Sequence, residues 1–395
     1  MQTIKKVNQF LSINTEEITP GLHLSSMPFW EGAQKKYGIS KCLPFDIVAE
    51  KGKPIMQISH DNLIDDVVNC YQSENYTFIT SPPGTSLWAD ELGNRKIKVV
   101  QEGLGEKKPK DILEIGGGSL WVGQKLIAIY NPDSYTIIDP ALKTSELGVN
   151  VIQDYFPSRH IGGKFFDLIL GFNVLEHVTD PLGFLLNIKK HLKPGGKVIL
   201  NFPDCERQLS QGDLNVLIHE HITYFTEKST RWISEAAGFN ILLLKSNNDL
   251  FTLILENMNK DFDKEHKIDE SELLNLSFKM FENLFDKTTK KIAEVLDAGN
   301  FVGFHGATHG LNSFLYISGL ENHSNIRIYD NDSSKEGLYL PSCKNKILTA
   351  KDETYGQNSL LVISAMSFFE EIKSNILQEK IFGPKSIFPL LGQIL

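Results

Sequence analysis

The amino-acid sequence predicts an α/β protein built from two units in which strands and helices alternate, preceded by a small N-terminal region. In the first unit an apolar strand, Asp111–Ile115, runs into three consecutive glycines and then into an apolar, helix-compatible segment. Short apolar strands continue to alternate with helical stretches up to residue 257, which indicates a mainly parallel sheet. A second strand, glycine turn and helix begin after residue 300, so the same plan is used twice.

The first unit is entered by a helix that starts at about Leu87. Its strands are expected near residues 111–115, 135–139, 149–152, 166–171 and 197–202, and a further helix near 227–237. Two apolar segments, Asn240–Lys245 and Leu250–Glu256, flank the polar residues 246–249. This pattern predicts a hairpin at the end of the sheet.

A connecting helix and a second strand–helix unit are expected after the hairpin. One long amphipathic pattern over residues 267–298, ended by Gly299, predicts the helix. The second unit starts with the strand and glycine turn Phe301–Ala307 and continues with strands at 326–330 and 360–364. Residues 1 to about 105 have mixed patterning with a proline and glycine break at 81–85, so they carry the weakest signal.

Length, charge and hydropathy narrow the class of protein. A chain of 395 residues is long enough for two or three domains, each with its own core. The formal net charge of −9 disfavours a nucleic-acid partner, which requires a basic face. No apolar run approaches the roughly 20 residues that span a bilayer, and the N-terminus lacks the apolar core of a signal peptide. We therefore expect a cytoplasmic protein that acts on a small molecule and has no membrane partner.

The cysteines give no sign of a metal site. Cys42, Cys70, Cys205 and Cys343 stand far apart, and no two of them form a C-x-x-C pair. We expect buried or incidental thiols without a disulfide framework, and we predict no metal.

The glycine loop is the strongest functional signal. Gly116, Gly117 and Gly118 let the backbone approach a ligand closely, and the following helix can aim its N–H groups at that ligand. Asp139 ends the next strand, about twenty residues further on, where Rossmann-like sites hold a ribose. The glycines do not have the G-x-G-x-x-G spacing of a dinucleotide site. The loop therefore predicts a nucleoside ligand other than a dinucleotide.

Two later segments extend this pattern. The first is Phe166–His177, which ends in Asn-Val-Leu-Glu-His, and the second is Leu192–Leu200, which contains Lys-Pro-Gly-Gly. Together with the glycine loop they resemble the core of the class I methyltransferases that use S-adenosylmethionine. The resemblance implies a seven-stranded Rossmann-like sheet whose final strand runs antiparallel, and S-adenosylmethionine as the cofactor.

A narrower resemblance rests on the block His219–Thr226, which reads H-E-H-I-T-Y-F-T, and on residues 306–341 of the second unit. These segments resemble the nucleotide-sugar C-methyltransferases of deoxysugar biosynthesis, over about residues 75–380. The resemblance implies methyl transfer to a carbon of a nucleotide-linked keto-sugar. It also implies four parts of the chain: an N-terminal region at 1–75, a donor domain at 76–258, a connecting helix at 259–299 and a C-terminal Rossmann-like acceptor domain at 300–395.

The sequence departs from that family in several places. The family's N-terminal cysteine cluster, which often binds zinc, is absent here. A tyrosine before the Glu-His pair is replaced by Ile218, and a His-Gly-Gly segment by residues 247–249. In the second unit Gly310 and Leu311 stand where the family has lysine and glycine. These changes bear on the acceptor more than on the donor.

Methylation of a carbon beside a sugar carbonyl requires a base that takes the α-proton and a donor group that stabilises the enolate oxygen. We predict that His221 is the base, that Glu220 orients it or carries the proton, and that His177 polarises the oxygen. Tyr76 is a further catalytic candidate, because it stands in a segment similar to the family's active-site aromatic segment. Strand carboxyl ends line ligand sites in such sheets, so His177 and the 219–221 block are expected at the same edge.

The remaining candidates fall into two groups. For the donor we expect Glu114, Gly116, Gly117, Gly118, Asp139, Asp154 and Asn173, with Asp139 on the ribose hydroxyls and Asp154 on the adenine amine. For the acceptor we expect Phe78, Tyr224, His305, Gly306, Ala307, Asn312 and Asp330. Tyr76, Phe78 and Tyr224 also suit core positions.

Three other functions remain open from the sequence. An O-methyltransferase acting on a sugar or related polyol needs only one base and tolerates the missing tyrosine and His-Gly-Gly. A non-catalytic protein that keeps a donor pocket is a second alternative, against which the intact His177, Glu220 and His221 speak. An NAD(P)-dependent oxidoreductase is disfavoured by the glycine spacing. The sequence does not specify the sugar, its nucleotide, the methylated position or the oligomeric state.

Overall fold

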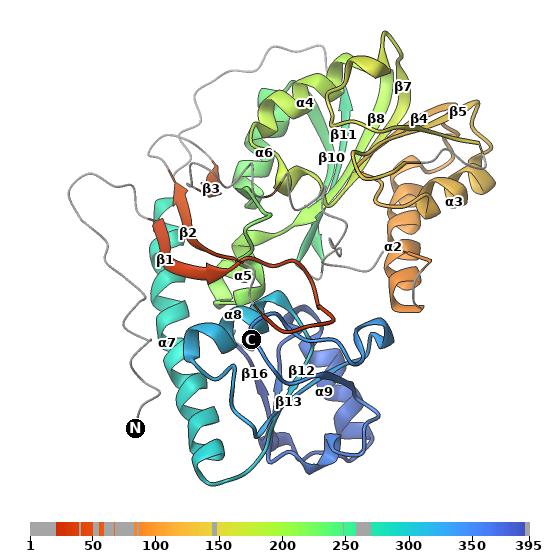
Figure 1. The fold of residues 1–395 in the computed structure, drawn as a ribbon. Coiled ribbons are helices and arrows are strands. Elements are labelled where there is room, and N and C mark those ends of the chain that lie inside the picture. Colours follow the sequence, from red (N-terminus) through yellow and green to blue (C-terminus); the bar gives the residue numbers. More distant parts are fainter. Residues whose placement is uncertain are drawn as a thin grey trace.

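A computed structural model describes residues 21–38, 41–49, 55–58, 67, 83–84, 87–143, 148–247, 249–257 and 270–391. Within these ranges the strands form sheets of four, seven and five strands. Figure 1 shows the seven-stranded sheet in the upper part of the view and the five-stranded sheet in the lower part. The long helix α7 (Ser271–Asp297) runs along one side, from the N-terminal strands to the lower sheet.

The largest sheet has the strand order β10–β11–β8–β7–β4–β5–β6. Its strands are β4 (Asp111–Ile115), β5 (Ser134–Ile138), β6 (Val149–Ile152), β7 (Phe166–Phe172), β8 (Leu192–Pro203), β10 (Phe239–Asn247) and β11 (Leu250–Asn257). The strands β4 to β8 are parallel, whereas β11 is antiparallel to both β8 and β10. This mixed sheet confirms the predicted fold class, its five expected parallel strands and the final hairpin.

Alternating side chains of the central strands build a hydrophobic layer on each face of this sheet. Ile112 and Leu168 belong to one buried cluster, and their neighbours Leu113 and Ile169 belong to another. Successive side chains of a strand point to opposite faces, so continuous apolar strands are buried on both faces, as is typical of parallel sheets. Helices cover these layers: α2 (Leu87–Leu104) and α3 (Trp121–Tyr130) on one face, α4 (Pro181–Lys190) and α6 (Glu227–Ala236) on the other.

The four-stranded sheet joins the N-terminal region to the first unit. Its strands are β1 (Gly21–Pro28), β2 (Cys42–Ala49), β3 (Met56–Ile58) and β9 (Thr223–Tyr224), in that order. β9 belongs to the His219–Thr226 block, and it pairs antiparallel with β3 at Met56 and Gln57. The N-terminal strands therefore help to fix the position of this block, a role that the sequence did not reveal.

The C-terminal sheet is parallel throughout and has the order β14–β13–β12–β15–β16. Its elements are β12 (Val302–His305), α8 (His309–Ser318), β13 (Ile326–Asp330), β14 (Ile347–Thr349), β15 (Leu360–Ile363), α9 (Phe369–Gln378) and β16 (Ile387–Pro389). The predicted strands at 326–330 and 360–364 correspond to β13 and β15. The sheet is consistent with a second Rossmann-like unit.

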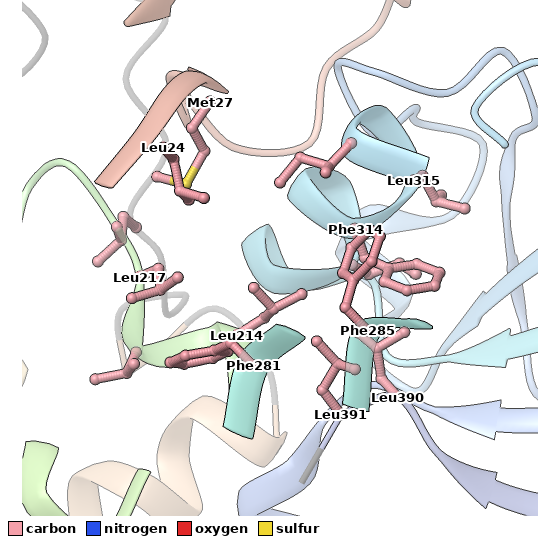
Figure 2. Packing of buried hydrophobic residues seen from close by; sticks show 14 of the residues in the cluster. Leu24, Met27, Leu214, Leu217, Phe281, Phe285, Phe314, Leu315, Leu390 and Leu391 are labelled. Carbon is pink, nitrogen blue, oxygen red and sulfur yellow. The ribbon is translucent and has the colours of Figure 1, made fainter. Parts of the chain in front are cut away.

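A shared core holds the C-terminal unit against the rest of the protein. Phe281 and Phe285 of α7, the predicted connecting helix, pack in one cluster with Leu214 of the first unit and Phe314 of α8. Figure 2 shows these side chains together with Leu24 and Met27 of β1, which belong to the same cluster. Removal of the C-terminal unit would uncover this apolar surface, so the unit is best studied within the full chain.

Short elements complete the described structure. They are α5 (Cys205–Gln211), η2 (Arg159–Ile161), η3 (Leu175–His177), η4 (Leu214–Val216), η5 (Ser333–Lys335), η6 (Tyr355–Gln357), η7 (Met366–Phe368) and η8 (Pro384–Ser386). Among the described helices, none has the length and apolar character needed to cross a membrane. Cys205 and Cys343 are buried free thiols and Cys42 is an exposed one, whereas Cys70 lies outside the described residues.

Candidate active site at the carboxyl edge of the large sheet

The glycine loop after β4 is closely packed. Gly116 has a φ of +67°, a left-handed conformation that favours glycine. A Cβ at Gly116 would lie 2.5 Å from Cγ2 of Val174, and one at Gly117 would lie 2.8 Å from Cγ2 of Ile137. The loop can therefore keep this path only with glycines, and it lies against the segment that follows β7.

Asp139, directly after β5, holds this loop in place through hydrogen bonds to its backbone. One carboxylate oxygen accepts the backbone N–H of Gly118 at 2.8 Å, and the other accepts the N–H of Ala141 at 2.7 Å. The side chain is 5 % exposed. A carboxylate can accept about four hydrogen bonds, so Asp139 can hold the loop and still accept from a ribose hydroxyl, as predicted.

Glu114, in β4 just before the loop, interacts electrostatically with Lys96 of α2. The hydroxyl of Tyr135 donates to Oε2 of Glu114 at 2.7 Å. Burial raises the pKa of Glu114 to about 7, although this hydrogen bond and the charge of Lys96 oppose the shift. Burial also lowers the pKa of Lys96, against the attraction of Glu114 and Glu176. Lys96 was missed in the sequence because a single lysine in an amphipathic helix is usually a solvated one.

Asp154 lies at the surface, after β6. It accepts the hydroxyl of Ser158 at 2.6 Å and the N–H of Tyr155 at 2.8 Å, and the hydrogen bond from Ser158 lowers the pKa of Asp154. The adjacent residues Val151, Ile152, Gln153 and His160 line a hollow of about 290 Å³. The contact of Asp154 with the donor's adenine stays a prediction, and this hollow is the space beside Asp154.

Asn173 links the loop region to the histidines. Its φ of +57° is left-handed, a conformation that asparagine adopts more readily than most residues. Its Nδ2 donates to Oε1 of Glu176 at 3.2 Å. Asn173 therefore orients a buried carboxylate, and its predicted donor contact remains untested.

Two predicted catalytic histidines meet at this edge. The rings of His177, in η3, and His221 lie 5.2 Å apart between centroids, in an edge-on arrangement. Nδ1 of His177 donates to the carbonyl oxygen of Glu220 at 2.7 Å, which fixes the tautomer with the lone pair on Nε2. Burial lowers the pKa of His177 to about 4 and that of His221 well below its usual value. Both imidazoles are therefore neutral at neutral pH.

Glu176 is a second residue that sequence reasoning overlooked. It is 1 % exposed, and its Oε1 lies 3.9 Å from Nε2 of His177. Burial, with a smaller contribution from the charge of Glu220, raises the pKa of Glu176 to about 8, although hydrogen bonds and the charge of Lys96 oppose the shift. One ligand atom from each of Glu176, His177 and His221 lies within 4.8 Å of the other two. The adjacent glutamate and histidine after β7 were the available signal.

The rest of the His219–Thr226 block is built into the interior. Glu220 is 1 % exposed, and His219 stacks against Phe29 and Phe45. Tyr224 is fully buried, and its hydroxyl donates to the carbonyl oxygen of Ile218 at 3.2 Å. These contacts support packing for Tyr224, and a contact with the acceptor would require β9 to move.

The predicted acceptor residues of the C-terminal unit take part in internal contacts. His305 bonds the Tyr355 hydroxyl at 2.6 Å between Nδ1 and oxygen, and Oδ1 of Asn312 accepts the N–H of Ser342 at 2.8 Å. Asp330 accepts the N–H of Ala307 and forms an ion pair with Lys335, at 2.8 and 2.9 Å. A Cβ at Gly306 would lie 2.9 Å from Cβ of Ala365. Acceptor contacts by these residues stay predictions.

The C-terminal unit nevertheless reaches the histidine cluster. Nε2 of His309, at the start of α8, donates to the carbonyl oxygen of Asn215 at 2.7 Å, and His309 interacts electrostatically with His221. Nδ2 of Asn215 in turn donates to the carbonyl oxygen of Ser364 at 2.8 Å. The N-terminal turn of α8 is therefore docked beside the site. Tyr76 and Phe78 lie outside the described residues.

Comparisons with known proteins agree with the fold. Residues 90–244 match a family model described as "Methyltransferase domain". A ubiquinone biosynthesis O-methyltransferase of Rickettsia akari is 24% identical over 128 residues, which are 30% of this chain and 50% of that protein. One of Rickettsia conorii is 31% identical over 67 residues, 17% of this chain and 22% of that protein. The chain thus spans half the length of the first relative and less of the second.

Solved structures give more distant matches. One match is a putative S-adenosylmethionine-dependent methyltransferase from Listeria monocytogenes. It has 12% identity and a TM-score of 0.36, and the match covers 43% of this chain and 100% of that one. The N-methyltransferase NodS of Bradyrhizobium japonicum, in complex with S-adenosylhomocysteine, matches with 15% identity and a TM-score of 0.34, covering 50% and 99%. The family match supports the expectation of an enzyme that uses S-adenosylmethionine. Residues 90–244 thus match a methyltransferase domain, and the order and direction of the seven strands agree with the expected class I fold.

Proposed function

We propose that this protein transfers the methyl group of S-adenosylmethionine to a carbon of a nucleotide-linked keto-sugar. The observation that carries the proposal is the junction of the glycine loop with the histidine cluster. Val174 packs on Gly116, and Asn173 from the same turn bonds Glu176. A donor held over Gly116–Gly118 would therefore stand next to His177 and His221.

The donor side of the proposal rests on the loop and on Asp139. Close backbone approach at the glycines suits the methionine part of the donor, and the carboxylate of Asp139 suits its ribose hydroxyls. Lys96 adds a positive charge that interacts with Glu114, two residues before Gly116, and it is a candidate partner for the donor's carboxylate. The methyl group would then face the carboxyl edge of β7 and β8.

The acceptor side rests on the two neutral imidazoles. A neutral imidazole accepts a proton, so His221 can take the α-proton of the keto-sugar while a donor group holds the enolate oxygen. The enolate carbon then attacks the sulfonium methyl: a carbon–carbon bond forms, the sulfur–methyl bond breaks, and S-adenosylhomocysteine leaves. Because burial lowers the pKa of His221, it is a weak base, and we propose that its chain neighbour Glu220 shares the proton.

The C-terminal unit is proposed to bind the acceptor's nucleotide. Support comes from the position of α8 beside the site. Nε2 of His309 donates to the carbonyl oxygen of Asn215, and His309 interacts electrostatically with His221. Gly306, Ala307, Asn312 and Asp330 lie around the same end of the C-terminal sheet. Their present internal contacts mean that binding there must compete with the Lys335 ion pair of Asp330.

An O-methyltransferase is the second candidate, and one observation favours it. The curated relatives are ubiquinone biosynthesis O-methyltransferases. Transfer to a hydroxyl oxygen requires a single base and no enolate, so the buried His177–His221 pair is sufficient for it. The two reactions share the donor site and differ only in the acceptor.

A product screen separates these functions. The full-length protein is incubated with S-adenosylmethionine and a panel of nucleotide-linked keto-sugars, and products are followed by mass spectrometry and by NMR of the new methyl group. We expect a methyl signal coupled to a sugar carbon skeleton. A methoxy signal would reject carbon methylation and support the O-methyltransferase function.

Titration calorimetry with S-adenosylhomocysteine completes the experiment. Donor binding without any methylated product over the panel, with phenolic and sugar hydroxyl acceptors included, would indicate a non-catalytic donor-binding protein. Absence of donor binding would reject every form of the proposal.

A further inference from the structure

Glu176, His177 and His221 bring a carboxylate and two imidazoles together at the edge of the sheet. One ligand atom from each lies within 4.8 Å of the other two. We propose that these three residues bind one divalent transition-metal ion, of the zinc or iron class. The site shares His177 and His221 with the proposed function, and a metal bound to His221 would leave Glu220 as the base. The test below therefore measures metal binding itself and does not depend on turnover.

The tautomer of His177 is already the one that a metal requires. Its Nδ1–H donates to the carbonyl oxygen of Glu220 at 2.7 Å, so the lone pair stands on Nε2. Histidine ligands of metals almost always donate their other ring N–H to a carboxylate, a carbonyl or a water. The Nε2 faces Oε1 of Glu176 at 3.9 Å, so a cation between them would touch both.

Two buried polar atoms of the cluster lack hydrogen-bond partners within the described structure. These are Oε2 of Glu176, on a side chain only 1 % exposed, and Nδ1 of His221. An unsatisfied buried acceptor costs about 1–3 kcal/mol, so native proteins usually pair such atoms with protein, water or an ion. A metal ion bound through Nδ1 of His221 and through both carboxylate oxygens of Glu176 would pair both.

The charged neighbours of the cluster are Glu220 and Lys96, which both interact electrostatically with Glu176. The negative charge of Glu220 favours a bound cation, and the positive charge of Lys96 opposes it. His309 stays outside the ligand set, because its Nε2 donates to the carbonyl oxygen of Asn215.

The ligand set indicates the class of metal. Two histidines and one carboxylate form catalytic zinc sites and the facial sites of non-haem iron, and both keep a position open for another ligand. Ligand atoms of a tetrahedral zinc site stand roughly 3.4 Å apart, so modest side-chain rotations would close the cluster. The open position would face the carboxyl edge, where an acceptor oxygen could occupy it.

The test measures metal binding by the chelator-treated, full-length protein. Zn²⁺ is titrated by calorimetry, and Co²⁺ is used as a spectroscopic probe. We expect one equivalent of saturable binding, a rise in Tm on metal addition, and visible Co²⁺ bands without a thiolate charge-transfer band. Absence of saturable binding in the wild-type protein would overturn the proposal.

Variants assign the site. Glu176→Gln and His221→Gln should each weaken Zn²⁺ binding by more than about a hundredfold, since loss of a ligand exceeds the about 10- to 100-fold cost of losing an outer hydrogen bond. Asn173→Gly keeps the left-handed backbone and removes only the hydrogen bond to Glu176, so a loss of about tenfold is expected. Lys96→Met should tighten binding, because it removes a competing positive charge.

Matched controls exclude other ligands. His160→Gln changes an exposed histidine and Cys42→Ser an exposed thiol, and both should bind Zn²⁺ as the wild type does. The proposal fails if Glu176→Gln and Asn173→Gly, each verified as folded by circular dichroism, retain wild-type affinity. It fails equally if either control abolishes binding.

Discussion

The two Rossmann-like units share a loop design but use it differently. In each unit a strand ends in a glycine turn, and the carboxylate at the end of the next strand accepts a backbone N–H of that turn at 2.8 Å: Asp139 from Gly118, and Asp330 from Ala307. Asp139 has no ion pair within the described residues. Asp330 is paired with Lys335.

The difference extends to the helix that follows each turn. The N-terminal turn of α8 is occupied by Asn215 of the first unit, where a Cβ at Gly310 would lie 2.6 Å from Oδ1 of Asn215. In the first loop, Asp139 has no ion pair among the described residues and lies beside glycines whose backbone a ligand can approach closely. This arrangement suits a binding site. The second uses the same geometry for docking between units. A glycine turn followed by a carboxylate therefore does not by itself identify a binding site. The two loops differ in whether that carboxylate forms an ion pair.

The largest expected effect is on catalysis in the first unit. His221→Ala should lower turnover by about a hundred- to ten-thousandfold, since that is the usual contribution of a general base. Affinity for S-adenosylhomocysteine, measured by calorimetry, should be nearly unchanged. His323→Ala, in the loop before β13, is the matched control and should retain wild-type turnover. Full activity of His221→Ala would remove this residue from the mechanism.

The next effect concerns docking of the second unit. Phe314 is fully buried in the shared core with Phe285, at 5.1 Å between ring centroids. Phe314→Ala should lower the free energy of unfolding by about 3–5 kcal/mol, measured by denaturant titration. Phe165→Ala, at a side chain 55 % exposed, should have little effect. Equal stabilities of the two variants would show that the units do not depend on the shared core.

The pH dependence of stability tests the burial of Glu114 before the first loop. The pKa of Glu114 rises from 4.5 to about 7 in the folded protein. Between these values the folded state keeps a proton that the unfolded chain releases, so the contribution of Glu114 to the free energy of unfolding should fall as pH rises from 4.5 to 7 and then level off. The loss is about 3 kcal/mol at most.

Glu114→Gln should flatten this slope, because glutamine does not titrate. Glu106→Gln, at an exposed position, should leave the slope unchanged. Denaturant titrations at several pH values measure both, and an unaltered slope in Glu114→Gln would reject the assignment.

The smallest effect compares the two loop carboxylates directly. Asp139→Ala should weaken binding of S-adenosylhomocysteine by about ten- to a hundredfold, which corresponds to the 1.5–3 kcal/mol of a hydrogen bond to a charged acceptor. Asp330→Ala should leave that affinity unchanged, since Asp330 belongs to the other unit and is paired with Lys335. Similar losses in both variants, by calorimetry, would contradict the division of roles.

The elements with strong local patterns were predictable, whereas long-range contacts were not. The continuous apolar strands, the hairpin and α7 follow from periodicity, and the glycine loop with Asp139 follows from spacing. The pairing of β9 with β3 at Met56 was hidden, because nothing local links positions so far apart in sequence.

The same limit applies to the site. His177, Glu220 and His221 were correctly expected at one edge, since strand carboxyl ends line up in a parallel sheet. Glu176 and Lys96 were missed because their importance depends on burial, which the sequence does not record. Tyr224 was an acceptor candidate by motif, yet it is fully buried with its hydroxyl on Ile218, a contact that only the three-dimensional packing reveals.

The most direct test of the central claim is solvent exchange at the acceptor carbon. The wild-type protein, with S-adenosylhomocysteine bound so that no methyl can transfer, is incubated in deuterium oxide with the keto-sugar that the product screen identifies. Carbon methylation through an enolate predicts deuterium at the carbon beside the carbonyl, and none with His221→Ala. Absence of deuterium at that carbon in the wild-type protein, together with a methyl on oxygen when S-adenosylmethionine is supplied in place of S-adenosylhomocysteine, would contradict the account.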